Sequence, residues 1–288
     1  MTGRVIQIVP LIGALLVPVA VRAQCAPAIQ QLLTDRKSNE ARVQVEKQLE
    51  RSPNDDAAMN CMGRLLLESG KPGDAVDWLE KAAKVNGKSA QHQLWLGNAL
   101  GAAAEKASMF KKLSFAGRVR AAYEQAVALD PTLVDARRGL VMVYSLMPSA
   151  MGGSMPKARE QAAEILKLNP MRGHLAYGTI AEREKDLPGA EKEFRAAIAV
   201  MPESAIPYNA TGGFFRRQKR WTDATAMYES ALKAKPEGMS VSISHYYLGV
   251  IHQENGRRDQ ARAEYQAALA ANPNNEDAAK ALASLKEN

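Results

Sequence analysis

The sequence predicts an all-α solenoid built from helix hairpins, and three observations lead to this prediction. A skeleton of small, aromatic and proline residues recurs along the chain, with 34 residues between Pro202 and Pro236 in its clearest copy. Aromatic residues make up only 6% of the chain while alanine is abundant, and this composition favours helices packed through small and medium side chains. The C-terminal segment carries one apolar stripe at helical spacing, as a capping helix would.

The chain begins with a segment that we interpret as a secretory signal peptide, residues 1–23. Arg4 gives it a positive start, an apolar run with two prolines follows, and Ala23 is a small residue suited to cleavage. A membrane anchor is the alternative, but the run is at the lower limit for spanning a bilayer, at about 17 residues. A lipoprotein site at Cys25 would need a small residue where Gln24 stands. We therefore expect a periplasmic or secreted protein, cleaved near Ala23.

The formal net charge is +7, and Arg4 and Arg22 lie in the segment expected to be removed. The remaining mild basic excess suits an acidic partner or an anionic surface without requiring one.

The repeat is clearest between residues 205 and 236. Its first helix is expected to carry Gly212 between Tyr208 and Phe215, and its second helix Tyr228 between two alanines. A glycine lets the two helices of a unit approach closely, while an aromatic side chain fills the space between neighbouring units. The same skeleton predicts the units 24–53 (degenerate), 56–88, 90–131 and 134–170 (both with inserts), 171–202, 205–236 and 242–273.

This skeleton resembles that of the tetratricopeptide repeat (TPR) family, and with its leader the chain looks like an exported bacterial member. The resemblance implies a right-handed superhelix of helix hairpins, in which each unit leaves an apolar face for the next to cover. Residues 275–286 are expected to be the capping helix, with Ala278, Ala281, Leu282 and Leu285 on one apolar face.

Cys25 and Cys61 are the only cysteines, and an even count in an exported chain suggests a disulfide. Counting back from Pro53 places Cys25 on the first helix of the degenerate unit, next to the helix that carries Cys61. Two buried free thiols are the alternative.

In TPR proteins the first helix of each unit lines the concave face, and the resemblance implies a partner-binding groove there for a protein or peptide. Amides and arginines can hold a peptide backbone or a carboxylate; a solvated face with no partner is the alternative. The candidate groove residues are Asn60, Arg64, Gln91, Asn98, Arg138, Arg172, Asn209, Arg216, Tyr246 and Gln253.

The predicted function is a non-catalytic scaffold or assembly factor in the bacterial cell envelope, with no cofactor, metal or catalytic residue. The four histidines show no metal-site spacing, and no phosphate-binding loop is present. One rival function is attachment to an anionic polymer or membrane through residues 102–120, a basic amphipathic stretch that otherwise reads as an extended helix hairpin. Residues 214–221 mix aromatics with bases as nucleic-acid binders do, but we interpret them as a basic turn. An enzyme with a site assembled across repeats is the second rival.

Overall fold

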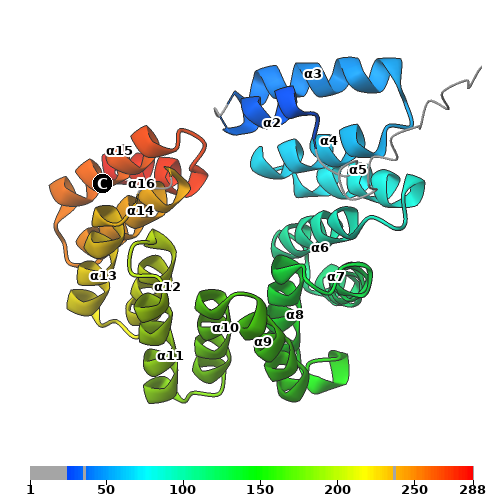
Figure 1. Cartoon of the computed structure of the whole chain (residues 1–288). Helices are drawn as coiled ribbons and strands as arrows, with labels where there is room; N and C mark the ends of the chain where they lie inside the picture. The colour runs from blue at the N-terminus through cyan, green and yellow to red at the C-terminus, as the bar shows by residue number, and fades with distance from the viewer. Residues whose placement is uncertain (1–24, 35–36, 236–237, 288) are drawn as a thin grey trace, which may run out of the picture.

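The computed structural model describes residues 25–34, 37–235 and 238–287, so the expected signal peptide lies outside the described residues. The described chain is a series of helices without a strand, arranged as an open-centred arc (Figure 1). The helices are α2 (Pro27–Thr34), α3 (Ser38–Arg51), α4 (Asp56–Glu68), α5 (Pro72–Val85), α6 (Ala90–Glu105), α7 (Met109–Leu129), α8 (Val134–Leu146), the 3₁₀ turn η1 (Ser149–Met151), α9 (Met155–Leu168), α10 (Pro170–Arg183), α11 (Leu187–Val200), α12 (Ala205–Arg217), α13 (Trp221–Lys233), α14 (Gly238–Glu254), α15 (Arg258–Ala271) and α16 (Glu276–Glu287). The predicted all-α solenoid is confirmed.

Short polar side chains and prolines set the starts of many helices. The side chain of Asp55 accepts a hydrogen bond from the Ala58 amide at 2.9 Å, and Ser89 and Asn169 cap α6 and α10 in the same way. Such a cap satisfies an amide that has no partner within the helix. Pro72 and Pro170 stand at the first position of their helices, where the missing N–H has no consequence.

Helices pair into hairpins, from α4–α5 through to α14–α15, and successive hairpins stack. The first helices of neighbouring hairpins also contact one another, in the order α4, α6, α8, α10, α12 and α14, whereas contacts between successive second helices are sparser. The first helices therefore follow the shorter, inner arc and form the concave face, and the second helices form the convex face (Figure 1).

In the hairpins α4–α5, α6–α7, α10–α11, α12–α13 and α14–α15, a glycine of the first helix faces a large side chain of the second, whereas Gly139 of α8 faces Tyr123 of the preceding hairpin. A Cβ at Gly212 would lie 2.9 Å from Cε1 of Tyr228, and one at Gly97 would lie 2.7 Å from Cε1 of Tyr123. Tyr228 is fully buried. The glycines thus fix how closely the two helices approach, and the rings they admit form the core between units.

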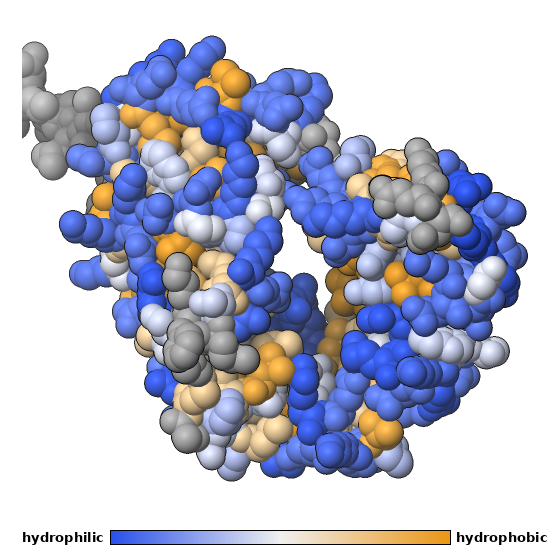
Figure 2. Space-filling view, turned by 180° about the vertical axis from the view of Figure 1, so that it is seen from behind, coloured by the Kyte–Doolittle hydropathy of each residue, from blue (hydrophilic) through white to orange (hydrophobic). Residues whose placement is uncertain are grey.

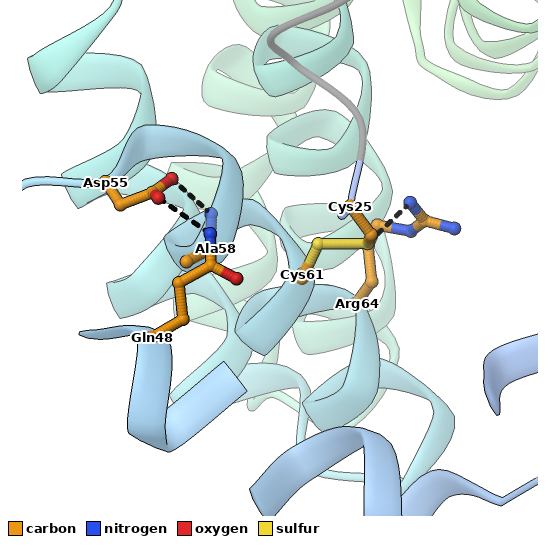
Figure 3. The surroundings of a disulfide bond; sticks show 6 residues. All are labelled: Cys25, Gln48, Asp55, Ala58, Cys61 and Arg64. Carbon is orange, nitrogen blue, oxygen red and sulfur yellow. Dashed lines mark hydrogen bonds between the residues drawn. A yellow bond between two sulfur atoms is a disulfide. The ribbon is translucent and has the colours of Figure 1, made fainter. Parts of the chain in front are cut away.

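A disulfide joins Cys25 to Cys61 on α4, with an S–S distance of 2.07 Å (Figure 3). Cys25 lies two residues before α2 and not on the helix where the sequence placed it. The reason is Pro27, which starts α2 and leaves Cys25 in the extended segment ahead of it. The bridge holds the N-terminal hairpin α2–α3 to the first complete unit.

At the other end, α16 covers the last hairpin, with Ala278 and Leu285 buried against it. The first insert lengthens α7, whose side chains at 109–111 and 113 lie outside those the structure describes. In the described part of the chain, no helix is both long and apolar enough to cross a bilayer.

Candidate partner-binding groove

The concave face surrounds an opening through the molecule, which Figure 2 shows from behind. Its wall consists of the first helices, so the residues on these helices decide what the opening can bind. Most of the surface around the opening is hydrophilic in this view. A partner of the wall is therefore held by hydrogen bonds and charge as well as by apolar contact.

Two arginines on opposite arms of the arc lie over aromatic rings of the next first helix. The guanidinium carbon of Arg64 on α4 lies 4.7 Å from the ring centroid of Trp95 on α6. That of Arg216 on α12 lies 4.5 Å from the ring centroid of Tyr247 on α14. In each arginine the Nε atom is buried and has no hydrogen-bond partner among the described residues. A buried Nε atom is closed to a ligand, so a carbonyl or carboxylate would reach each half-buried guanidinium through its Nη groups.

Arg64 also donates from Nη1 to the Sγ atom of Cys25 at 3.3 Å (Figure 3). Burial lowers the pKa of Arg64, and the nearby Glu68 carboxylate partly offsets this effect. A guanidinium stays charged at neutral pH even so. The disulfide therefore lies beside a fixed positive charge of the candidate groove.

A second basic site lies in the middle of the arc. Arg138 on α8 and Arg172 on α10 donate to the same oxygen of Asp135, at 2.9 and 2.8 Å. Two guanidinium groups share one carboxylate here, so one positive charge is left over. Arg138 is the more exposed of the two, with 53% of its side chain accessible, and could rotate towards a ligand.

Three predicted groove amides are engaged inside the solenoid. Asn209 donates to the Ser240 carbonyl at 3.1 Å and accepts from the Ser244 hydroxyl at 2.7 Å, which ties α12 to α14. The side-chain oxygens of Asn98 and Gln253 accept from tyrosine hydroxyls of their own hairpins. These amides position helices and have less capacity left for a partner.

Asn60 is only 1% exposed, so the expectation that it faces an open groove is wrong. Asn209, at the equivalent position of its unit, reaches across to the next first helix, and Asn60 is covered in the corresponding place. Both side-chain amide atoms of Asn60 lack a hydrogen-bond partner among the described residues. The two remaining candidates, Gln91 and Tyr246, are half-buried on α6 and α14, and Tyr246 packs against Tyr247 with ring centroids 4.9 Å apart.

Histidine–carboxylate pairs within and between hairpins did not emerge from the sequence. His92 is fully buried and lies 2.9 Å from Asp56 on the preceding first helix. Burial alone would raise the pKa of Asp56, but hydrogen bonds to His92 and Asn86 outweigh it and lower that pKa. His174 and His245 each pair with a glutamate 19 residues further on, at 2.8 and 2.7 Å. The interval of 19 residues between histidine and glutamate, which occurs in both hairpins, is the feature of the sequence from which these pairs could have been predicted.

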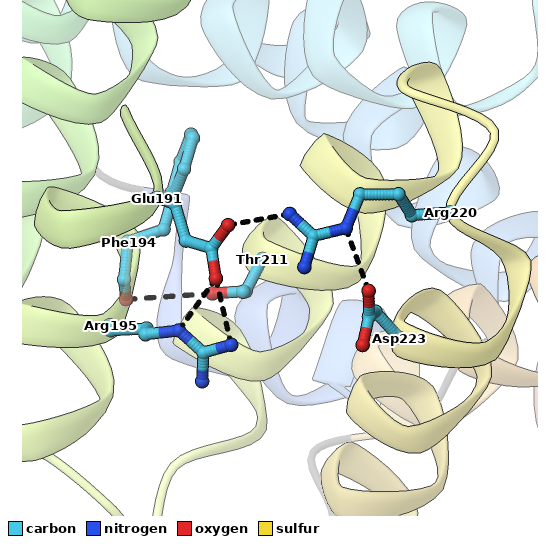
Figure 4. Close-up of polar contacts among 6 residues, drawn as sticks. All are labelled: Glu191, Phe194, Arg195, Thr211, Arg220 and Asp223. Atoms are coloured by element: carbon cyan, nitrogen blue, oxygen red, sulfur yellow. Dashed lines mark hydrogen bonds and ion pairs between the residues drawn. The ribbon is translucent and has the colours of Figure 1, made fainter. Parts of the chain in front are cut away.

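Two of the four bases in the segment 214–221, Arg217 and Arg220, are engaged with carboxylates. Arg217 makes two hydrogen bonds to Glu182, and Arg220 bridges Glu191 at 2.5 Å and Asp223 at 2.7 Å (Figure 4). The hydrogen bond from Arg220 is the main cause of the lowered pKa of Glu191. A basic turn paired in this way offers less positive charge to an anionic polymer.

In the rest of the described chain, Arg118 of the first insert pairs with Glu80 of the preceding unit. No three His, Cys, Asp or Glu side chains among the described residues are grouped as a metal ion would need. The arginines Arg64, Arg138, Arg172 and Arg216 of the concave face therefore make up the charged part of the candidate groove.

Comparison with known proteins shows which families and proteins this chain is similar to. Sequence models described as tetratricopeptide repeat match residues 62–106, 186–238 and 215–285. The Type IV pilus assembly protein PilF of Pseudomonas aeruginosa is 26% identical over 137 residues, which are 46% of this chain and 53% of PilF. The TPR repeat-containing protein PA4667 of the same organism is 29% identical over 169 residues, 57% of this chain and 28% of that protein. The chain thus matches about half or less of the length of these curated relatives.

Two solved structures share the fold. Yeast Tom70 has a TM-score of 0.64 at 15% identity, covering 93% of this chain and 54% of Tom70. A tetratricopeptide repeat protein from Parabacteroides merdae ATCC 43184 has a TM-score of 0.58 at 15% identity, covering 91% of this chain and 96% of that protein. At such identity the likeness concerns the fold alone. Together with the repeat models, it shows that the chain belongs to the tetratricopeptide repeat family.

Proposed function

We propose that this protein is exported and binds a protein or peptide partner along its concave face, as a scaffold or assembly factor of the bacterial cell envelope. A scaffold with a protein-interaction role follows from the TPR family; the concave face, the export and the envelope are the proposed part. The observation that carries the site is the pair Arg64 and Arg216, two half-buried guanidinium groups that lie over aromatic rings on opposite arms of the concave face.

Three further observations support the export and the setting. The leader-like residues 1–23 precede the described chain, and the Cys25–Cys61 disulfide suits an oxidising compartment. The similarity to a protein named for Type IV pilus assembly favours an assembly role. Cell fractionation with mass determination of the purified protein tests the export directly. A periplasmic or secreted chain that begins near Gln24 is expected, and an intact leader on a cytoplasmic chain would contradict it.

The site is tested by crosslinking the mature protein in its own cell envelope and identifying the captured proteins. The groove variant carries Arg64→Ala, Arg138→Ala and Arg216→Ala. The matched control removes three arginines from second helices, Arg159→Ala, Arg195→Ala and Arg262→Ala, so both variants lose the same charge.

A discrete partner that is captured by the wild type and the control but lost from the groove variant supports the proposal. Equal capture by all three proteins would move the site away from the concave face. Loss in both variants, restored at low salt, would favour the alternative of attachment to an anionic polymer or membrane, because that attraction depends on total charge.

A further inference from the structure

The two ends of the arc touch. Gly70 in the turn between α4 and α5 has a φ of 69° and lies against Glu276, the first residue of α16. A Cβ added at Gly70 would lie 3.3 Å from Cδ of Glu276 and would collide with its Oε1 atom. The first complete unit, α4–α5, and the capping helix α16 therefore meet, although all the hairpins from α6 to α15 lie between them in the chain. Figure 2 shows the consequence, an opening with the molecule on all sides.

The two sides of this contact carry opposite charges. On the N-terminal side, Lys106 donates from Nζ to the Gly70 carbonyl at 2.7 Å, and the exposed Lys71 follows in the chain. On the C-terminal side, Glu276 and Asp277 form the first turn of α16, where Glu276 also pairs with Lys280 at 3.1 Å. Among the described residues no salt bridge joins the two sides, so this small contact can form and break. It has the properties of a gate.

A closed ring restricts what can reach the concave face. A closed ring admits a polypeptide only by threading from one end, and an extended strand presents its backbone in the narrowest form a polypeptide has. Acidic side chains would suit the wall, because Arg64 and Arg216 place half-buried guanidinium groups on it and Arg138 shares the Asp135 carboxylate with Arg172. A partner that is an amphipathic helix would have to rotate within the ring to bring its apolar face to the wall.

We infer that the concave face is the wall of a gated channel that takes a single extended acidic polypeptide strand, with the gate at the contact between Gly70 and Glu276. The inference rests on the proposed function and adds to it the conformation and charge of the partner and its route of entry.

The test locks the gate covalently. Lys71→Cys with Glu276→Cys, treated with a short bismaleimide under non-reducing conditions, ties the two ends while the native cysteines stay in their disulfide. The control pair is Glu80→Cys with Arg118→Cys, which ties α5 to α7 without spanning the opening. Binding is measured by fluorescence anisotropy with two probes: a short poly-L-glutamate chain with free ends, and the same chain carrying a folded domain at each end.

We expect the locked ring to bind the free-ended chain as the control does and to bind the chain with two folded domains at least about tenfold more weakly. Equal binding of both probes by the locked ring would overturn the channel. Failure of the 71–276 pair to crosslink, while the control pair does, would show that the ends lie apart and would overturn the gate.

If the pair crosslinks but the unlocked protein does not bind poly-L-glutamate, the acidic strand is wrong. That result leaves the proposed function to its own experiment, because capture in the envelope through the groove arginines needs no acidic strand. Binding of poly-L-glutamate that survives Arg64→Ala with Arg216→Ala would overturn the assignment of these two arginines.

Discussion

Gly97→Ala and Gly101→Ala add the same methyl group to α6, and the structure predicts opposite effects on stability. A Cβ at position 97 would lie 2.7 Å from Cε1 and 2.8 Å from Cδ1 of Tyr123, whereas position 101 has no neighbouring atom within 4 Å. Alanine in place of glycine stabilises a helix interior by about 0.5–1 kcal/mol. A methyl group forced into a packed contact costs about 1–3 kcal/mol.

Gly101→Ala should therefore raise the free energy of unfolding by about 0.5–1 kcal/mol. Gly97→Ala should leave it unchanged or lower it by up to about 2.5 kcal/mol, because the clash offsets the helical gain. Urea denaturation gives the two values, and amide hydrogen exchange in α6 and α7 shows where the loss occurs, since units of a solenoid can open separately.

The decisive result is the difference between the two variants. If Gly97→Ala is as stable as Gly101→Ala, the close approach of glycine to tyrosine does not limit the hairpin, and the packing argument fails. A second variant guards against an unrelated cause. Tyr123→Leu shortens the side chain that the new methyl group meets, so the double variant should lose less stability than the two single losses added together.

Three other predictions concern the ends and the titrating groups. Reduction of the disulfide should speed amide exchange in α2 and α3 and leave α10 to α15 unchanged, because α3 packs on α4 while the helices from α10 to α15 pack on their own neighbours; the chain-entropy model bounds the effect at about 4 kcal/mol. Exchange that rises throughout the solenoid would contradict this. Burial raises the pKa of Tyr123 and of Tyr265 to about 12, so their contribution to stability is present below pH 10 and should be lost as the pH rises through 12. Absorbance titration of the phenols checks this, and ionisation near pH 10 in the folded protein would refute it. Arg220→Ala should raise the pKa of Glu191 towards its ordinary value, as followed by NMR; an unchanged value would show that Arg220 does not hold that carboxylate.

The hairpins could be predicted from the sequence because their contacts are local. Gly212 and Tyr228 stand 16 positions apart, and the same two kinds of residue recur at the same interval in the next unit, as Gly249 and Tyr265. Such a repeated pair defines which faces of two helices meet, and each unit then packs its two helices in the same way. The structure places a Cβ of Gly249 2.6 Å from Cδ1 of Tyr265, which is the close approach the spacing predicts.

The groove was predicted less completely, because a position in the repeat fixes the direction of a side chain but not what covers it. Arg216 and Asn60 were assigned to the same inner surface. Arg216 lies half-buried over Tyr247, while Asn60 is enclosed. The repeat pattern gives both residues the same direction and does not distinguish these two degrees of burial. Burial of an inner-face side chain is thus a property of two units together.

The closure of the ring could not be predicted from any pair of units. Whether Gly70 reaches Glu276 depends on the sum of the rotations between all the hairpins in between, so a small change at one junction moves the far end by a large amount. The two inserts lie in that path, one that lengthens α7 and one in the turn around η1. The repeat spacing in the sequence shows that two successive hairpins stack, but it does not give the angle between them. The contact between the ends is therefore the feature for which the three-dimensional arrangement is indispensable, and it decides whether the inner wall faces a groove or a channel.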